Sequence, residues 1–359
     1  MSGRIIYIGW VDQGNLGDDL CRDIFIQEFC AAGGAQRAIE SVSPQQIKAN
    51  DFVRNRPDLV VLGGGSLIHP YYLVPLLWAQ QYGIPTVVWG SGVDGLPAEI
   101  LARVQSGESL NGYCLQSHKA ELIRHVITNC NQVGLRGPHT LSYLRSLGCS
   151  TALEICGDPG LMLRQSETDF CSENLFVGGV PTVGVNWGTT GNKLYGGSEK
   201  EVARQLVRVI RELSQNMRVI LYAVWPPDLA PLKDLADAVG RSKQIILCET
   251  VPSTSFLISL LNGCLFTINF KLHANVFAAA LGNPFICLGY RSKCFDFAAS
   301  LEAEDLVIST AAENLADEVL ALSAKIEANF RLYQRRISAI ISVYPIRLRR
   351  LIKQCVHLL

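Results

Sequence analysis

The sequence has no excess of charge of either sign, because its 359 residues include 32 lysines and arginines against 32 aspartates and glutamates. A neutral chain has no general attraction to a phosphate backbone, so the composition does not support a nucleic-acid partner. The sequence also lacks any apolar run of the roughly 18 to 20 residues that a membrane-spanning helix needs. Its first residues, MSGRIIYIG, lead directly into a predicted strand without a signal-peptide core. We therefore expect a cytoplasmic protein.

Several ligand-binding signatures are missing as well. None of the 12 cysteines forms a Cys-x-x-Cys pair, and no histidine, cysteine and carboxylate group has metal-ligand spacing. Most cysteines lie inside apolar runs, which predicts reduced thiols that behave as small hydrophobes. The glycine-rich turns match neither the dinucleotide fingerprint Gly-x-Gly-x-x-Gly nor the Gly-Lys-Ser/Thr ending of a P-loop. We predict no metal and no cofactor.

What the sequence does contain is a regular alternation of short apolar runs with longer amphipathic ones, within a chain that is 48% hydrophobic. This alternation is typical of α/β proteins with parallel sheets. The predicted strands are Ile5–Ile8, Leu59–Leu62, Thr86–Trp89, Gln132–Leu135, Ala152–Ile155, Thr182–Asn186, Val219–Ala223, Ile245–Cys248, Phe266–Asn269, Phe285–Leu288 and Leu306–Ile308.

The length and the two series of strands predict two doubly wound, Rossmann-like domains that face each other across a cleft. We place the N-terminal domain at residues 1–165 and the C-terminal domain at residues 175–325. The polar stretch Arg164–Asn174 is the predicted linker. Residues 326–359 form a basic helical segment that we expect to pack back on the first domain.

A small-residue turn, Gly14–Asp18, follows the first predicted strand. Glycine and Asn15 tolerate the left-handed backbone that a tight turn or a close ligand requires. Asp18 can cap the next helix, which we expect from Leu20. Turn geometry alone explains this segment as well as a ligand does.

A second turn, Gly63–Ser66, follows the second predicted strand. Gly64, Gly65 and Ser66 carry little or no side chain where the sheet ends, which suits a ligand that lies against the backbone. His69 follows the turn, where either a ligand contact or a structural role fits.

Cations and a histidine stand at the ends of later strands. Lys271 and His273 come between a buried strand and an apolar helix, and the N-terminus of a helix favours anions. Arg136 also follows a predicted strand. Its guanidinium either binds a carboxylate or phosphate through two hydrogen bonds or lies on the surface without a ligand. Lys293 follows the strand Phe285–Leu288. These positions predict an anionic substrate.

The pair Asn186-Trp187 ends another strand and combines an amide with an aromatic face. Both groups suit the recognition of a sugar. Together with the cations, the pair predicts a site that takes an anion and a saccharide.

The chain resembles the polysaccharide pyruvyl transferases in the order and spacing of its motifs over about residues 5 to 300. This family transfers the enolpyruvyl carbons of phosphoenolpyruvate onto a sugar as a cyclic ketal, and its fold is similar to that of two-domain (GT-B) glycosyltransferases. The matching motifs are Asn15-x-Gly17-Asp18, Gly63–Gly65, Arg136, Gly157-Asp158-Pro159, Val185-Asn186, Lys271-Leu272-His273-Ala274, Gly282-Asn283-Pro284 and Tyr290-x-x-Lys293.

The resemblance implies which residues bind the donor. The family's Arg-Leu-His triplet and an upstream arginine hold phosphoenolpyruvate, and these roles fall on Lys271, Leu272, His273 and Arg136. Lys271 stands where the family usually has arginine, so the charge is kept and the bidentate fork is lost. We add Lys293 and the turn Gly64-Gly65-Ser66 to the predicted donor site.

The implied reaction needs proton transfer but no metal. Histidine, with a reference pKa of about 6.5, suits either transfer, so His273 is the predicted catalytic residue and Asp18 its partner or a second base. The predicted acceptor-binding residues are Asn15, His69, Asn186 and Trp187. The resemblance implies an acceptor that is a saccharide of cell-surface polysaccharide biosynthesis.

Two other functions fit the same pattern. One is a GT-B glycosyltransferase that uses a nucleotide sugar, although no base-binding or ribose-binding segment stands out. The other is a catalytically inactive relative that binds a sugar or an anion, which the lysine at position 271 permits.

The last part of the chain is basic, since residues 328–359 contain seven cations and no acidic side chain. The cations are Arg331, Arg335, Arg336, Arg347, Arg349, Arg350 and Lys353. One interpretation is a terminal helix that packs on the first domain with its charges solvated. The other is a peripheral helix on the inner face of the membrane, which would bring the site to a lipid-linked saccharide.

Overall fold

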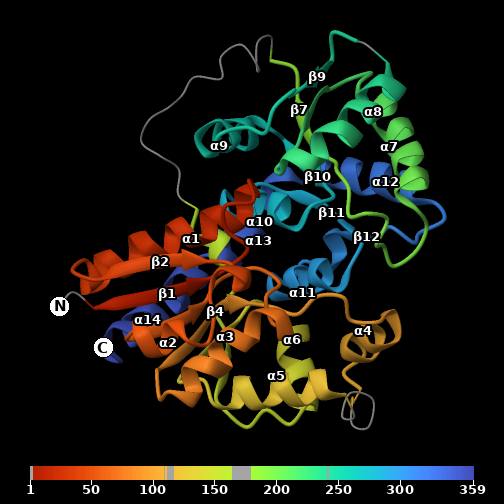
Figure 1. Cartoon of the computed structure of the whole chain (residues 1–359). Coiled ribbons are helices and arrows are strands. Elements are labelled where there is room, and N and C mark those ends of the chain that lie inside the picture. The colour runs from red at the N-terminus through yellow and green to blue at the C-terminus, as the bar shows by residue number, and fades with distance from the viewer. Residues whose placement is uncertain (1–2, 109, 111–116, 164–178, 241) are drawn as a thin grey trace. The chain divides into compact units, whose positions relative to one another are not determined.

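The computed structural model describes residues 3–108, 110, 117–163, 179–240 and 242–359 (Figure 1). The chain divides into two compact units. The first contains residues 1–13, 18–162 and 343–359, and the second contains residues 14–17 and 163–342. Among the described residues, no helix has both the length and the apolar character to cross a membrane. The predicted linker Arg164–Asn174 lies outside the described residues.

The first unit contains a parallel sheet of six strands in the order β2-β1-β3-β4-β5-β6. Its strands are β1 (Arg4–Ile8), β2 (Ala38–Val42), β3 (Leu59–Leu62), β4 (Thr86–Ser91), β5 (Gln132–Leu135) and β6 (Leu153–Ile155). Side chains alternate between the two faces, so that Ile6 and Ile8 enter one apolar core and Ile5 and Tyr7 enter another. The sheet is therefore buried on both sides, as parallel sheets usually are.

Helices cover both faces of this sheet. They are α1 (Leu16–Phe29), α2 (Asp51–Arg54), α3 (Pro70–Gln81), α4 (Ala98–Gln105), α5 (His118–Thr128), α6 (Pro138–Ser146) and α14 (Tyr344–His357). Residues of α3 to α6 contribute to one core, whereas residues of α1 and α14 contribute to the other.

Helix α14 brings the end of the chain into the first unit, and Figure 1 shows it in blue among the red and orange elements. Leu348, Leu351 and Ile352 are buried in the core with β1, β3 and β4. Each such side chain contributes about 1.5 to 3 kcal/mol when it is fully buried. The indole Nε1 of Trp89 donates to the carbonyl of Leu348 at 3.2 Å. These apolar residues of the basic segment therefore pack on protein.

The cations of α14 also have protein partners. Arg349 makes two hydrogen bonds to Glu28, at 2.9 and 3.0 Å, and Arg350 pairs with Glu154. Arg347 donates to the carbonyl of Ile155 at 3.0 Å. The contact of this helix with a membrane surface stays a prediction. Anionic lipid would have to compete with these ion pairs for the arginines.

The second unit contains another parallel sheet of six strands, in the order β12-β11-β10-β7-β8-β9. Its strands are β7 (Thr182–Asn186), β8 (Arg218–Tyr222), β9 (Ile245–Leu247), β10 (Phe266–Asn269), β11 (Phe285–Gly289) and β12 (Val307–Ser309). Its helices are α7 (Glu199–Leu213), α8 (Leu229–Val239), α9 (Thr254–Gly263), α10 (Leu272–Ala280), α11 (Ser292–Ser300), α12 (Leu315–Ala328) and α13 (Phe330–Ile341). The central strands β7 and β10 are buried along their whole length.

The predicted fold class is confirmed: two six-stranded parallel sheets, each with helices around it. Every predicted strand is present within two residues at either end. The edge strand β2 was not predicted, because Glu40 and Ser41 interrupt its apolar character. Helix α1 begins at Leu16 rather than at Leu20, so Asp18 lies in its first turn and is not its cap.

The basic C-terminal segment is not one piece, which differs from the predicted boundary at residue 326. Residues 343–359 belong to the first unit, whereas α12 and α13 belong to the second. Helix α13 stays with the second unit because Ile337 is buried and Ser338 lies against Gly282, at the end of α10.

Gly157 allows α14 to approach the sheet, and its replacement should destabilise the first unit. Its φ is 85°, and an added Cβ would overlap the ring of Tyr344. Gly83 also has a positive φ, 64°, but nothing lies within 4 Å of an added Cβ. We expect Gly157→Ala to cost about 1 to 3 kcal/mol more than Gly83→Ala, since overpacking adds to the backbone strain that both share. Thermal unfolding of the two variants measures this difference, and equal losses would show that Tyr344 moves aside freely.

Candidate functional site

The predicted residues of the second unit follow the central strands of its sheet. Connections lead away from β7 on one side and from β10 on the other, so the switch in strand order lies between these two neighbours. In open α/β sheets ligands bind beyond the carboxyl ends of the strands at such a point. Asn186 ends β7, and Lys271 and His273 follow β10.

Lys271 is the N-cap residue of α10, and its side chain is mostly buried. Its backbone N–H donates to Asn186 Oδ1 at 2.9 Å, which joins the ends of β7 and β10. Its Nζ lies 2.9 Å from Asp228 Oδ1, donates to the carbonyl of Thr189 at 2.6 Å and faces the ring of Trp225. The ammonium predicted to bind a donor anion thus has a carboxylate partner of its own.

Burial governs the charges of this pair. It raises the pKa of the Asp228 carboxyl, and the ammonium of Lys271 opposes that shift. It lowers the pKa of Lys271, which Asp228 opposes and the nearby cation of Lys293 reinforces. The pair is held together because each charge would be costly to bury alone.

His273 lies in the first turn of α10, and its side chain is 8% exposed. Its ring stacks near Phe277, with 6.1 Å between the ring centroids. Within the described part of the chain, no hydrogen-bond partner lies within reach of its Nε2. Gly17, which groups with the second unit, allows the ring this position, because a Cβ at residue 17 would overlap the imidazole. This contact gives the glycine of the Asn-x-Gly-Asp motif a physical reason.

The other predicted residues of this unit are Lys293 and Leu272, assigned to the donor, and Asn186 and Trp187, assigned to the acceptor. Lys293 lies in the first turn of α11 with its Nζ 5.3 Å from the centroid of the Tyr290 ring, and its charge reaches Lys271. Leu272 is buried. Asn186 and Trp187 are 0% and 2% exposed, and a contact of either with an acceptor stays a prediction. The Asn186 amide also donates to the carbonyl of Tyr222 at 3.0 Å.

In the first unit, the switch in strand order lies between β1 and β3. Asp18, in the first turn of α1, and the turn after β3 both lie at this edge. Gly65 has a φ of 111°, and an added Cβ would be 2.9 Å from Asp18 Oδ1. A Cβ at Gly63 would overlap the hydroxyl of Tyr7, so glycine is required for steric reasons at both positions.

Arg136 follows β5 and is fully buried, so the alternative of a surface arginine is wrong. Its Nη1 donates to Ser66 Oγ at 3.0 Å, and its Nη2 donates to the carbonyl of Val93 at 3.1 Å. The guanidinium passes over Gly92, where an added Cβ would lie 2.5 Å from Nη2. The structure therefore joins the arginine to the glycine-rich turn through Ser66.

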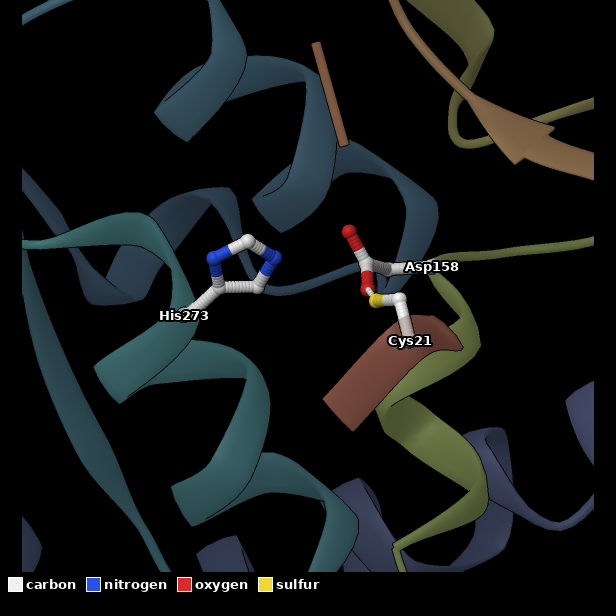
Figure 2. A group of neighbouring side chains, drawn as sticks. All are labelled: Cys21, Asp158 and His273. Carbon is white, nitrogen blue, oxygen red and sulfur yellow. Dashed lines mark hydrogen bonds between the residues drawn. The ribbon is translucent and has the colours of Figure 1, made fainter. Parts of the chain in front are cut away.

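Asp158 is a further buried acid of the first unit, in the loop after β6. Figure 2 shows it beside Cys21 of α1, whose Sγ donates to Asp158 Oδ1 at 3.8 Å. The same oxygen accepts from the N–H of Gly160 at 2.9 Å, and Oδ2 has no partner among the described residues. Burial raises the pKa of Cys21 well above its usual value, and Asp158 adds to the shift. Figure 2 also draws His273, which belongs to the second unit.

Two predicted acceptor residues have local structural roles. His69 caps α3, since its Nδ1 accepts from the N–H of Tyr71 at 3.3 Å. Asn15 Oδ1 accepts from the N–H of Gly17 at 3.2 Å and closes the turn before α1. Neither contact excludes a ligand. That Arg136 and Lys271 face one cleft near His273 stays a prediction, since they belong to different units.

A comparison with family models decides where this chain belongs. The model of the polysaccharide pyruvyl transferases matches residues 15–292. The chain belongs to this family. The match begins at Asn15 and includes Asp18, Arg136 and His273, whereas Lys293 lies one residue beyond it. A search of curated proteins found no match.

Solved structures similar to this pyruvyl transferase family member support its GT-B-like fold. A UDP complex of MnaA from S. aureus is 12% identical with a TM-score of 0.63, covering 99% of this chain and 98% of the other. UDP-GlcNAc 2-epimerase from Neisseria meningitidis, bound to UDP-GlcNAc, is 11% identical with a TM-score of 0.61 and 99% coverage of each chain. A UDP-glucosyltransferase from Polygonum tinctorium is 9% identical with a TM-score of 0.62, covering 100% of this chain and 98% of the other.

Asp228 is the residue of the site that sequence reasoning missed. It lies in the turn that follows β8, and nothing in the sequence of that turn names Lys271 as its partner. The available signal was an aspartate directly after Pro226-Pro227.

The Lys271–Asp228 pair gives a prediction about stability. Lys271→Met should cost about 3 to 5 kcal/mol, because it leaves a buried carboxylate without its counter-charge, and the double variant with Asp228→Asn should lose much less. The control Arg208→Met breaks an exposed pair with Asp317 and should cost under about 1 kcal/mol. Denaturant unfolding of the four proteins measures these losses.

The stability of the Lys271→Met variant should also depend on pH. Since burial already raises the pKa of Asp228, removing Lys271 should raise it further. The folded Lys271→Met variant then takes up a proton before the unfolded chain does, so its stability relative to wild type should improve as pH falls through that raised pKa. A deficit independent of pH would show that the lysine acts through packing alone.

Proposed function

We propose that this protein transfers the pyruvyl group of phosphoenolpyruvate to a saccharide and forms a cyclic ketal in polysaccharide biosynthesis. The observation that supports it most is His273, a nine-tenths buried histidine whose Nε2 has no hydrogen-bond partner among the described residues. The resemblance assigns it to the histidine position of the family's donor-binding triplet, and it lies within the range that the family model matches. A buried nitrogen without a partner is costly unless a ligand or a reaction uses it.

The donor is small and densely anionic, so its binding needs cations and backbone N–H groups. In this proposal Arg136, with Ser66, binds one anionic group of phosphoenolpyruvate. The N–H groups at the start of α10 and the cations Lys271 and Lys293 bind another. Gly64 and Gly65 leave the backbone of the turn open to the donor.

The chemistry requires balanced proton transfers. The donor's methylene carbon gains a proton and becomes a methyl group, and one sugar hydroxyl loses its proton as its oxygen attacks the neighbouring carbon. Phosphate then leaves with the bonding electrons, and a second hydroxyl adds with loss of its proton. His273 carries the first proton transfer, and Asp18 is the proposed second base.

A binding protein without transferase activity is the second candidate, which the Lys271–Asp228 ion pair favours. At the position where the family usually has arginine, the ammonium is already matched by a carboxylate at 2.9 Å. A pocket whose ammonium is already paired binds an anion less strongly than a pocket with an unpaired cation does.

An assay of released products separates these functions. With phosphoenolpyruvate, a UDP-sugar and a panel of saccharide acceptors, we expect inorganic phosphate to appear only when acceptor and phosphoenolpyruvate are both present. Release of UDP would instead identify a glycosyltransferase. Donor binding without either product would identify the inactive relative.

Within that assay, His273→Ala should lower kcat by about 10²- to 10⁴-fold while phosphoenolpyruvate still binds. His118→Ala is the matched control, because His118 is fully exposed at the start of α5 and should leave kcat unchanged. An unaltered kcat in His273→Ala would assign the histidine to packing.

A further inference from the structure

Asp228 stands out because its carboxylate is fully buried beside a residue of the proposed donor site. It directly precedes α8, and its Oδ1 accepts from the N–H of Thr189 at 3.0 Å and from Lys271 at 2.9 Å. Gly188 makes room for it, because an added Cβ there would overlap the carboxyl group. The loop after β7 is thus shaped around this acid.

The contacts of Lys271 leave it little capacity for another anion. Its Nζ lies against Asp228, the carbonyl of Thr189 and the ring of Trp225, all within the second unit. A carboxylate at this distance cancels the positive charge that an approaching anion would meet. Lys293 and Glu199 are the other charged groups whose fields reach the ammonium, and they have opposite signs.

We infer that Asp228 is an internal counter-anion that competes with the donor for Lys271 and so sets the affinity of the site for anions. This inference rests on the proposed function only in naming the donor as phosphoenolpyruvate. Any anion that binds at Lys271 must share the ammonium with Asp228 or displace it.

An isosteric substitution separates the charge of Asp228 from its shape. Asp228→Asn keeps an oxygen that accepts from both Lys271 and Thr189. The position of Oδ2 has no hydrogen-bond partner among the described residues, so its replacement by an amide nitrogen breaks no bond there. The substitution therefore removes chiefly the negative charge.

The experiment is calorimetric titration of wild type and Asp228→Asn at pH 6.5 with phosphoenolpyruvate and, separately, with inorganic phosphate. We expect Asp228→Asn to bind both anions about tenfold more tightly, the usual effect of removing one neighbouring like charge. The gain should disappear in Asp228→Asn/Lys271→Met. Asp317→Asn, which removes the carboxylate of an exposed pair with Arg208, should show no gain.

The pH dependence is a second readout. Burial lowers the pKa of Lys271 and Asp228 opposes this, so the substitution should lower that pKa further. The gain in affinity needs the protonated ammonium and should therefore shrink as pH rises from 6.5 to 9. Circular dichroism and thermal unfolding confirm that each variant is folded.

Unchanged or weaker anion binding by folded Asp228→Asn would overturn the inference and leave the acid a purely structural role. A gain that persists without Lys271 would overturn it too. Tighter phosphate binding that depends on Lys271, in a protein that releases no phosphate from phosphoenolpyruvate, would uphold the inference while the proposed function fails. If wild type transfers the pyruvyl group but Asp228→Asn binds neither anion more tightly, the proposed function holds and the inference about Asp228 fails.

Discussion

The structure depends on one constraint, which is that parallel strands all end at the same edge of their sheet. Every loop that follows a strand then lies at that edge, whatever its place in the sequence. In the second unit this places Asn186, the last residue of β7, beside Lys271, which follows β10, and the side-chain amide of Asn186 joins the two strand ends. In the first unit it places the turn after β3 within reach of Arg136 after β5, and Ser66 links them. Glycines at these edges are required where a neighbouring side chain fills the space of a Cβ.

Both units bury a cation that was predicted to bind the donor. Arg136 of the first unit is fully buried, and its Nη1 and Nη2 donate to the hydroxyl of Ser66 and the carbonyl of Val93. Lys271 is matched by a carboxylate, so the second unit offers less free positive charge than its sequence suggests. A buried pair of this kind adds little to stability by itself, yet either charge alone would be costly. The same contact therefore affects both folding and the affinity for an anionic ligand.

Helix α14 shows how the end of the chain completes the first core. The helix is basic, which alone fits a membrane surface as well as a packed position. The buried face formed by Leu348, Leu351 and Ile352 decides for packing in this structure, because these residues belong to the same apolar core as residues of α1. Arg349 and Arg350 pair with acids of the first unit that lie far away in the sequence.

The sequence by itself determined the class of fold, the positions of the strands and the family, because apolar periodicity and short motifs are local properties. It also located Arg136, Lys271 and His273 at strand ends. The edge strand β2 escaped prediction because its half-exposed residues lack a continuous apolar run. Only the tertiary structure decided which side chains contact one another. Asn186, Trp187 and Arg136 proved to be buried, and Lys271 proved to pair with Asp228, 43 positions away. Such pairings arise from the packing of distant loops, which no local pattern encodes.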